Sequence, residues 1–166
     1  HVVQLALEPY LNQSNATAAV AWTTLGRMRL ASEDVVGALE AVKKGLAADY
    51  KALNPALLAL ELMGHQVKEA EPLVQQALRQ QSGSELAMSY VRVLIELNRY
   101  DDATAQLQTI TRNDPQLADA WLVLGSLQFE QGRDKEAESS LARYVKLAAQ
   151  TPNNTNTRGL TQAQTR

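Results

Sequence analysis

The sequence predicts an all-α fold of stacked helix-turn-helix repeats, and three observations support this prediction. First, an alanine followed four positions later by leucine or valine recurs at steps of 32, 33 and 34 residues, at Ala38, Ala70, Ala103 and Ala137. Second, each copy holds two segments whose apolar residues have the three- and four-residue spacing of a helix. Third, the sequence lacks alternating β-branched segments and two-residue hairpin turns. Such repeats bury a continuous core by stacking on one another.

The composition is that of a globular chain about the size of one domain. The 166 residues are 45% hydrophobic and 20% charged, and 16 Lys+Arg against 18 Asp+Glu give a net charge of -2. No basic stripe suited to nucleic acid is present, and apolar runs such as Ala18 to Trp22 are too short to span a bilayer. Without cysteine, the chain has no disulfide and no thiolate metal ligand. We therefore expect neither nucleic acid binding nor direct membrane insertion.

The last copy shows its two helical halves most clearly. Residues 121–129 are apolar nearly all round, as expected of a helix between two neighbours, whereas residues 135–148 are amphipathic. We expect Asp114-Pro115 to cap the start of the first helix of this copy. Asn98 and Gly132 tolerate a positive φ, so each is expected to lie at the turn that ends a first helix.

These residues resemble the tetratricopeptide repeat (TPR), a 34-residue helix-turn-helix unit. The resemblance in the last copy rests on Trp121, Leu124, Gly125, Gly132, Ala137, Leu141 and Leu147. The first copy matches at Trp22, Leu25, Gly26, Ala38 and Leu46. The second copy is the weakest, and its turn is expected to be shortened. Small residues such as Gly26 and Ala38 suit the close approach of helix axes, and tryptophan fills the adjacent hollow.

The resemblance implies a right-handed superhelix of paired helices, with copies at residues 19–51, 52–83, 84–117 and 118–151. Residues 1–18 are expected to hold the second helix of a preceding repeat. Residues 152–166 are expected to form a loop and the start of a further helix. The whole of residues 1–166 would then be one solenoid domain, cut from a longer array.

A looser resemblance is to the repeat arrays of bacterial periplasmic or outer-membrane-anchored TPR lipoproteins, which serve as adaptors and assembly factors. It favours a periplasmic or membrane-anchored location and leaves a cytoplasmic one open.

No pattern of catalytic residues stands out from the sequence. His65 is the only internal histidine and has no partner at metal-ligand spacing. Asp101 and Asp102 open a helix, where carboxylates favour the positive end of the dipole. Phosphate-binding loops and nucleophile motifs are also absent from the sequence. We therefore expect a protein that is not an enzyme and that takes no cofactor or metal.

In TPR proteins the first helices of successive repeats line a concave groove. By this resemblance, the peptide-binding residues are expected to be Thr23, Arg27, Leu30, Met88, Arg92, Ile95, Leu122, Ser126 and Phe129, with Val20, Glu85, Glu96, Asp119 and Glu130 at further exposed positions. The second copy aligns in two ways and contributes no residue to this set. Arg27 and Arg92 occupy the same repeat position with few acidic partners in register, so a carboxylate of the ligand is a candidate counter-charge.

Two functions remain open at this point. One is a scaffold or adaptor that binds another protein or peptide in the groove. The other is a structural or oligomerisation segment, whose apolar strip packs on another copy or on other repeats of a longer array.

Overall fold

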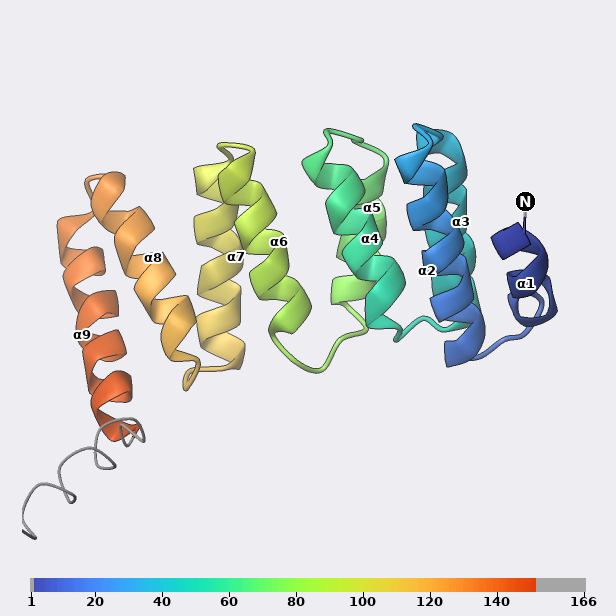
Figure 1. Cartoon of the computed structure of the whole chain (residues 1–166). Coiled ribbons are helices and arrows are strands. Elements are labelled where there is room, and N and C mark those ends of the chain that lie inside the picture. Colours follow the sequence, from blue (N-terminus) through green and yellow to red (C-terminus); the bar gives the residue numbers. More distant parts are fainter. Residues whose placement is uncertain (1, 152–166) are drawn as a thin grey trace, which may run out of the picture. The chain divides into compact units, whose positions relative to one another are not determined.

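The computed structural model describes residues 2–151, which form nine α-helices and no strand (Figure 1). The helices are α1 (Val2–Leu11), α2 (Ala16–Ala31), α3 (Val35–Ala48), α4 (Leu53–Gly64), α5 (Ala70–Leu78), α6 (Glu85–Glu96), α7 (Tyr100–Asn113), α8 (Ala118–Glu130) and α9 (Asp134–Gln150). The predicted all-α class is therefore confirmed. The loop and further helix predicted for residues 152–166 lie outside the described residues.

Each predicted copy contains two of these helices. Residues 19–51 hold α2 and α3, and the copies that follow hold α4 with α5, α6 with α7, and α8 with α9. The helix α2 begins ahead of its predicted copy because Asn15 caps it, accepting a hydrogen bond from the Ala18 backbone N–H at 3.0 Å. The single domain over residues 1–166 and the handedness of the superhelix stay predictions.

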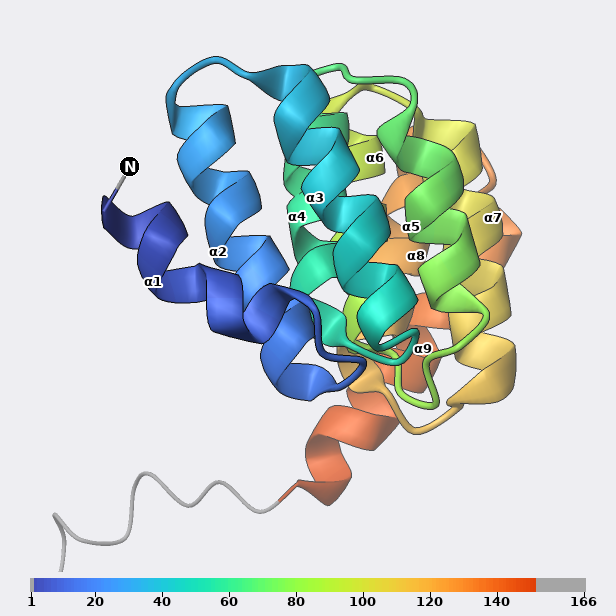
Figure 2. The same cartoon turned by 90° about the vertical axis from the view of Figure 1, so that its right-hand side faces the viewer.

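The chain divides into two compact units, residues 1–106 and residues 107–166, and the boundary falls inside α7. In the first unit, α2, α4 and α6 form one layer, in which each helix contacts the next. The helices α3 and α5 form a second layer behind them, and α1 packs on α2 (Figures 1 and 2). In the second unit, α8 packs along α9.

Small residues hold the first helices close to their neighbours, as the sequence predicts. A Cβ atom added at Gly26 would lie 2.6 Å from Leu58 Cδ2 and 3.1 Å from Ala41 Cβ. In the second unit, a Cβ atom added at Gly125 would lie 2.7 Å from Leu141 Cγ. All three distances are below ordinary van der Waals contact, so a side chain at either glycine would force its neighbours to shift.

The turns between helices use a residue with positive φ. The predictions for Asn98 and Gly132 are confirmed, with φ of 59° and 74°. Glu33 and Gln66 adopt the same conformation, with φ of 63° and 65°, although neither residue type predicts it. Gln66 precedes the repeat alanine of its second helix, Ala70, by four residues, whereas the other three turn residues precede theirs by five. The shortened turn expected in the second copy is wrong by the helix bounds, because five residues (65–69) separate α4 from α5, whereas three separate the two helices of each other copy.

The predicted cap at Asp114-Pro115 is wrong, because α8 begins only at Ala118. The backbone N–H of Leu117 donates to the Asp114 carbonyl at 3.2 Å, so these residues form a separate turn before the helix. The indole Nε1 of Trp121 donates to the Pro115 carbonyl at 2.9 Å. This bond ties the turn to the first turn of α8.

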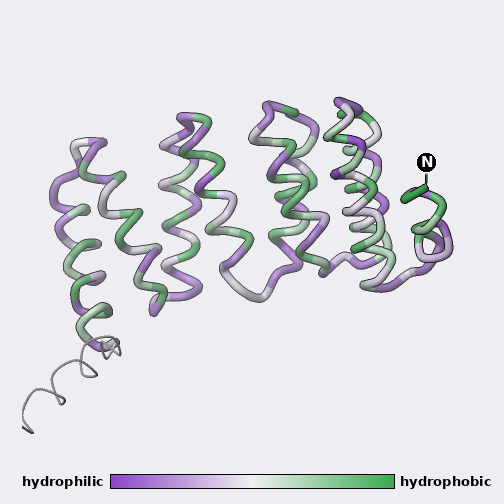
Figure 3. Tube along the Cα trace, viewed as in Figure 1, coloured by the Kyte–Doolittle hydropathy of each residue, from purple (hydrophilic) through white to green (hydrophobic). Residues whose placement is uncertain are grey.

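Hydropathy varies along every helix, with apolar and polar positions interleaved (Figure 3). Within residues 2–151, no helix combines the length and the apolar character needed to cross a bilayer.

We predict that Gly26→Ala lowers the free energy of unfolding by about 1 to 3 kcal/mol, because its methyl group would overpack buried Leu58 and Ala41. Gly64→Ala is the matched control. A Cβ atom there has open space, so this change is expected to be neutral or to stabilise by up to about 1 kcal/mol. Urea titrations of both variants measure the difference, and equal stabilities would contradict the close approach at Gly26.

Candidate functional site

The exposed surface of α2, α4 and α6 in the first unit, here called the first-helix face, carries two adjacent depressions. The first depression, of ≈ 490 Å³, is lined by Arg27, Leu30, Ala31, Glu33, Val35, Glu61, His65 and Val67. The second depression, of ≈ 430 Å³, is lined by Leu57, Leu60, Glu61, Gly64, His65, Ser89, Arg92, Val93 and Glu96. Glu61 and His65 line both. We call the two depressions together the groove.

The helix α4 positions the ridge between the depressions. Its residues from Pro55 to Met63 are apolar except for Glu61, and most of them are buried. The side chain of Glu61 is instead exposed, because it lies on the side of α4 that faces away from α3 and α5. His65 follows at the C-terminal end of the same helix and is also exposed.

The groove mixes apolar side chains with charges of both signs. Arg27 Nε lies 3.8 Å from Glu61 Oε2, and about half of each side chain is exposed (53% and 47%). Such a pair contributes little to stability in water. Arg92 forms no ion pair within residues 2–151. The sequence predicted few acidic side chains opposite the two arginines. This expectation is wrong for Arg27, because Glu61 faces it from the neighbouring helix.

The structure places three of the predicted binding residues in the groove and one in the core. Arg27 and Leu30 line the first depression, and Arg92 lines the second. Thr23 is 2% exposed, and its hydroxyl donates to the Ala19 carbonyl at 2.8 Å, so its predicted exposure is wrong. The local hydrogen bond satisfies the hydroxyl and allows its burial.

Two further predicted residues, Met88 and Ile95 of α6, are half-buried and line neither depression. In the second unit, Leu122, Ser126 and Phe129 are exposed on one side of α8. The hydroxyl of Ser126 donates to the Leu122 carbonyl at 2.9 Å, and Phe129 is 65% exposed. The exposed side of α8 therefore carries two apolar side chains, those of Leu122 and Phe129, with the hydroxyl of Ser126 between them in sequence.

The sequence prediction missed the contribution of α4. Because the second copy aligned in two ways, Leu57, Glu61 and His65 were left out of the predicted groove. One signal could have found Glu61. It is the only charged residue in the apolar run from Pro55 to Met63, and a lone charge in such a helix marks its exposed stripe.

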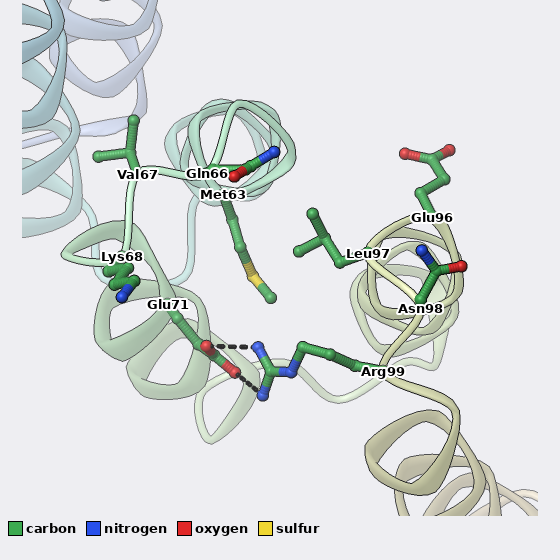
Figure 4. A pocket seen from close by; sticks show the side chains of 9 residues that line it. All are labelled: Met63, Gln66, Val67, Lys68, Glu71, Glu96, Leu97, Asn98 and Arg99. Atoms are coloured by element: carbon green, nitrogen blue, oxygen red, sulfur yellow. Dashed lines mark hydrogen bonds and ion pairs between the residues drawn. The ribbon is translucent and has the colours of Figure 1, made fainter.

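A third hollow, of ≈ 350 Å³, lies near the turns that follow α4 and α6 (Figure 4). One wall carries an ion pair in which Arg99 Nη1 and Nη2 donate to the two carboxylate oxygens of Glu71, at 2.7 and 2.9 Å. The Tyr90 hydroxyl also donates to Glu71, at 2.6 Å, and Arg99 Nε donates to Asp102 at 2.8 Å. This network joins α5 to α6 and to the start of α7.

Protonation of the network follows from these contacts. The hydrogen bonds from Arg99 hold the pKa of Glu71 below its usual value, against the opposing effect of partial burial. Burial, and then the bond to Glu71, raise the pKa of Tyr90 to about 12. The guanidinium of Arg99 has a raised pKa, chiefly through its bonds to Glu71. Because the Arg99 donors are engaged by Glu71 and Asp102, we interpret this cluster as a structural link between repeats.

Within residues 2–151, no three histidine or acidic side chains are arranged to hold a metal ion.

Paired helices that approach at small residues define the chain as a helical repeat protein. Residues 61–118 match one family model described as tetratricopeptide repeat, and residues 91–154 match a second model with the same description. The two matches together run over more than half of the chain. The chain belongs to the tetratricopeptide repeat family. No curated protein sequence matches the chain.

Solved structures show the same fold at low sequence identity. A crystal structure of MamA matches with a TM-score of 0.61 and 15% identity, over 88% of this chain and 86% of that one. A second MamA structure matches with a TM-score of 0.55 and 17% identity, over 79% and 73% of the two chains. The pilF protein of Pseudomonas aeruginosa matches with a TM-score of 0.53 and 19% identity, over 81% and 63%. The expected TPR helical solenoid class is thereby confirmed.

We predict that Glu71→Gln lowers the free energy of unfolding at pH 7 by about 1 to 3 kcal/mol, since it removes a charge-assisted pair with little exposed surface on Glu71. Asp102→Asn, at the more exposed partner of Arg99, is expected to cost less than about 1 kcal/mol.

The same pair predicts a pH dependence. Because the pKa of Glu71 is lowered on folding, its contribution to stability is complete above the ordinary glutamate pKa of about 4.3 and is lost as the pH falls through the lower folded value. Thermal melts between pH 7 and pH 2 should therefore converge for wild type and Glu71→Gln at the acid end. A difference that persists unchanged at low pH would contradict the assignment.

Proposed function

We propose that this chain is a protein-interaction scaffold that holds a peptide or protein segment in the groove of its first-helix face. TPR proteins are generally scaffolds rather than enzymes, and the role proposed here is binding. The observation that carries the proposal is the pair of adjacent depressions, each with an apolar floor and one arginine at its wall.

The form of the groove favours a chain-like ligand. Each depression has a volume of ≈ 430 to ≈ 490 Å³, which suits one or two side chains of a partner. The depressions adjoin along the row of first helices, so neighbouring parts of one segment can occupy both. Guanidinium groups at Arg27 and Arg92 can donate to carbonyl or carboxylate oxygens of that segment.

A second candidate is a structural or oligomerisation segment, and a specific observation favours it. The helix α1 buries none of its residues, and Val2 and Leu5 are 81% and 60% exposed. An apolar surface of this kind suits another helix, from a second copy or from further repeats. Sedimentation of the purified chain without ligand would detect self-association.

The proposal also retains the narrower sequence resemblance, namely a location in the bacterial periplasm or an anchor to the outer membrane. Fractionation of cells that produce the full gene product would test this part separately.

Two variants test the groove. A ligand is first selected from a displayed random peptide library against the purified chain. The double change Arg27→Ala with Arg92→Ala is then expected to weaken binding by about 1 to 4 kcal/mol, because it removes both guanidinium groups from the groove. Stability should change by less than about 1 kcal/mol, since both side chains are exposed.

The control removes two exposed cations from the other layer, with Lys43→Ala and Arg79→Ala, and should leave the affinity unchanged. Titration calorimetry gives the affinities. Equal effects of the two double changes, or no effect of either, would place the binding surface elsewhere.

A further inference from the structure

We propose that Glu61 determines the charge of the partner, so that the groove selects a segment carrying a lysine or arginine between two apolar side chains. This inference rests on the proposed function and names the class of ligand for the same groove.

The position of Glu61 is central. It lines both depressions, because α4 lies between α2 and α6 and contacts each of them. Packed helix axes are about 8 to 10 Å apart, so the two depressions are separated by roughly that distance. A peptide in the polyproline II conformation has three residues per turn and advances about 3.1 Å per residue, so side chains three residues apart lie on one face, about 9 Å from each other. Apolar side chains about three residues apart would therefore fill the two depressions, and the residues between them would pass over Glu61.

The charges of the groove favour a cation at this point. Three carboxylates line the depressions, those of Glu33, Glu61 and Glu96, against the two guanidinium groups of Arg27 and Arg92. The pair between Arg27 and Glu61 is long, at 3.8 Å, and half-exposed, so Glu61 keeps its capacity to accept from a second donor. A partner carboxylate over the ridge would face a like charge, whereas a partner cation would gain from it.

This inference revises the role of the two arginines. The sequence predicted that they meet a carboxylate of the ligand, but Arg27 already faces Glu61. Arginine also donates to backbone carbonyl oxygens, which every peptide carries. Arg27 and Arg92 then hold the partner's main chain, and Glu61 selects its side chain.

The test uses three blocked twelve-residue peptides with leucine at every third position. The remaining positions are serine, except for one central position that carries lysine, glutamine or glutamate. Titrations of wild type, followed by amide chemical shifts, are expected to give affinities in the order lysine, glutamine, glutamate. We expect the lysine peptide to bind on the order of tenfold more tightly than the glutamate peptide, as for a close charge pair at an interface.

The variant Glu61→Gln should reduce that ratio to less than about threefold, because it removes the charge and keeps the size of the side chain. Glu40→Gln is the matched control. Glu40 is an exposed carboxylate on α3, in the other layer, where it pairs with Lys44 at 3.2 Å. This control should keep the wild-type ratio. Both changed residues are exposed, and thermal melts verify that both variants are folded.

Preference of wild type for the glutamate peptide would overturn the inference, and so would an unchanged ratio in Glu61→Gln. If none of the three peptides binds while a library-selected ligand does bind the groove, the inference falls and the proposed function stands. If no library ligand is obtained and none of the three peptides binds, both fall.

Discussion

The close approach of helix axes at Gly26 is the constraint on which the groove depends. With no side chain at this position, α2 lies against Ala41 of α3 and Leu58 of α4, at distances that leave no room for a Cβ atom. The opposite side of α2 is then free of its own repeat. Arg27 follows Gly26 and lies about 100° further round α2, away from this contact, where it is exposed and lines the first depression. A packing requirement therefore places the side chains available for binding.

The ion pair of Glu71 with Arg99 adds a second constraint within the first unit. Stacked repeats bury apolar surface, which is non-directional and permits small rotations. A bidentate pair fixes direction as well as distance. The pair links α5, which packs on α4, to the turn after α6, and so it helps to hold α4 and α6, the two helices of the second depression, in register. The same turn closes the hollow of Figure 4.

Much of the fold could be predicted from the sequence, because its main signals are local. Small residues at repeat spacing predict where helices approach, and Asn98 and Gly132 predict where two of the first helices end. The start of α8 was predicted too early, since a turn at Asp114 and an indole hydrogen bond to Pro115 follow from contacts that no local pattern contains.

The groove could be predicted only in part. Counting repeat positions found Arg27, Leu30 and Arg92, because their copies align in one way only. It failed at Thr23, whose hydroxyl is satisfied by the backbone of its own helix and so tolerates burial. It also failed at Glu61. The second copy carries few of the family's residues, and the contact with Arg27 depends on how α2 and α4 pack together.

The most direct test of the central claim, that partners bind on the first-helix face, is site-specific photo-cross-linking. A photoreactive residue would replace Ser89, which lines the second depression on α6, or Gln76, which is exposed on α5 in the other layer. With a ligand selected from the peptide library, we expect cross-links from position 89 and none from position 76. Cross-links from position 76 alone would contradict this account.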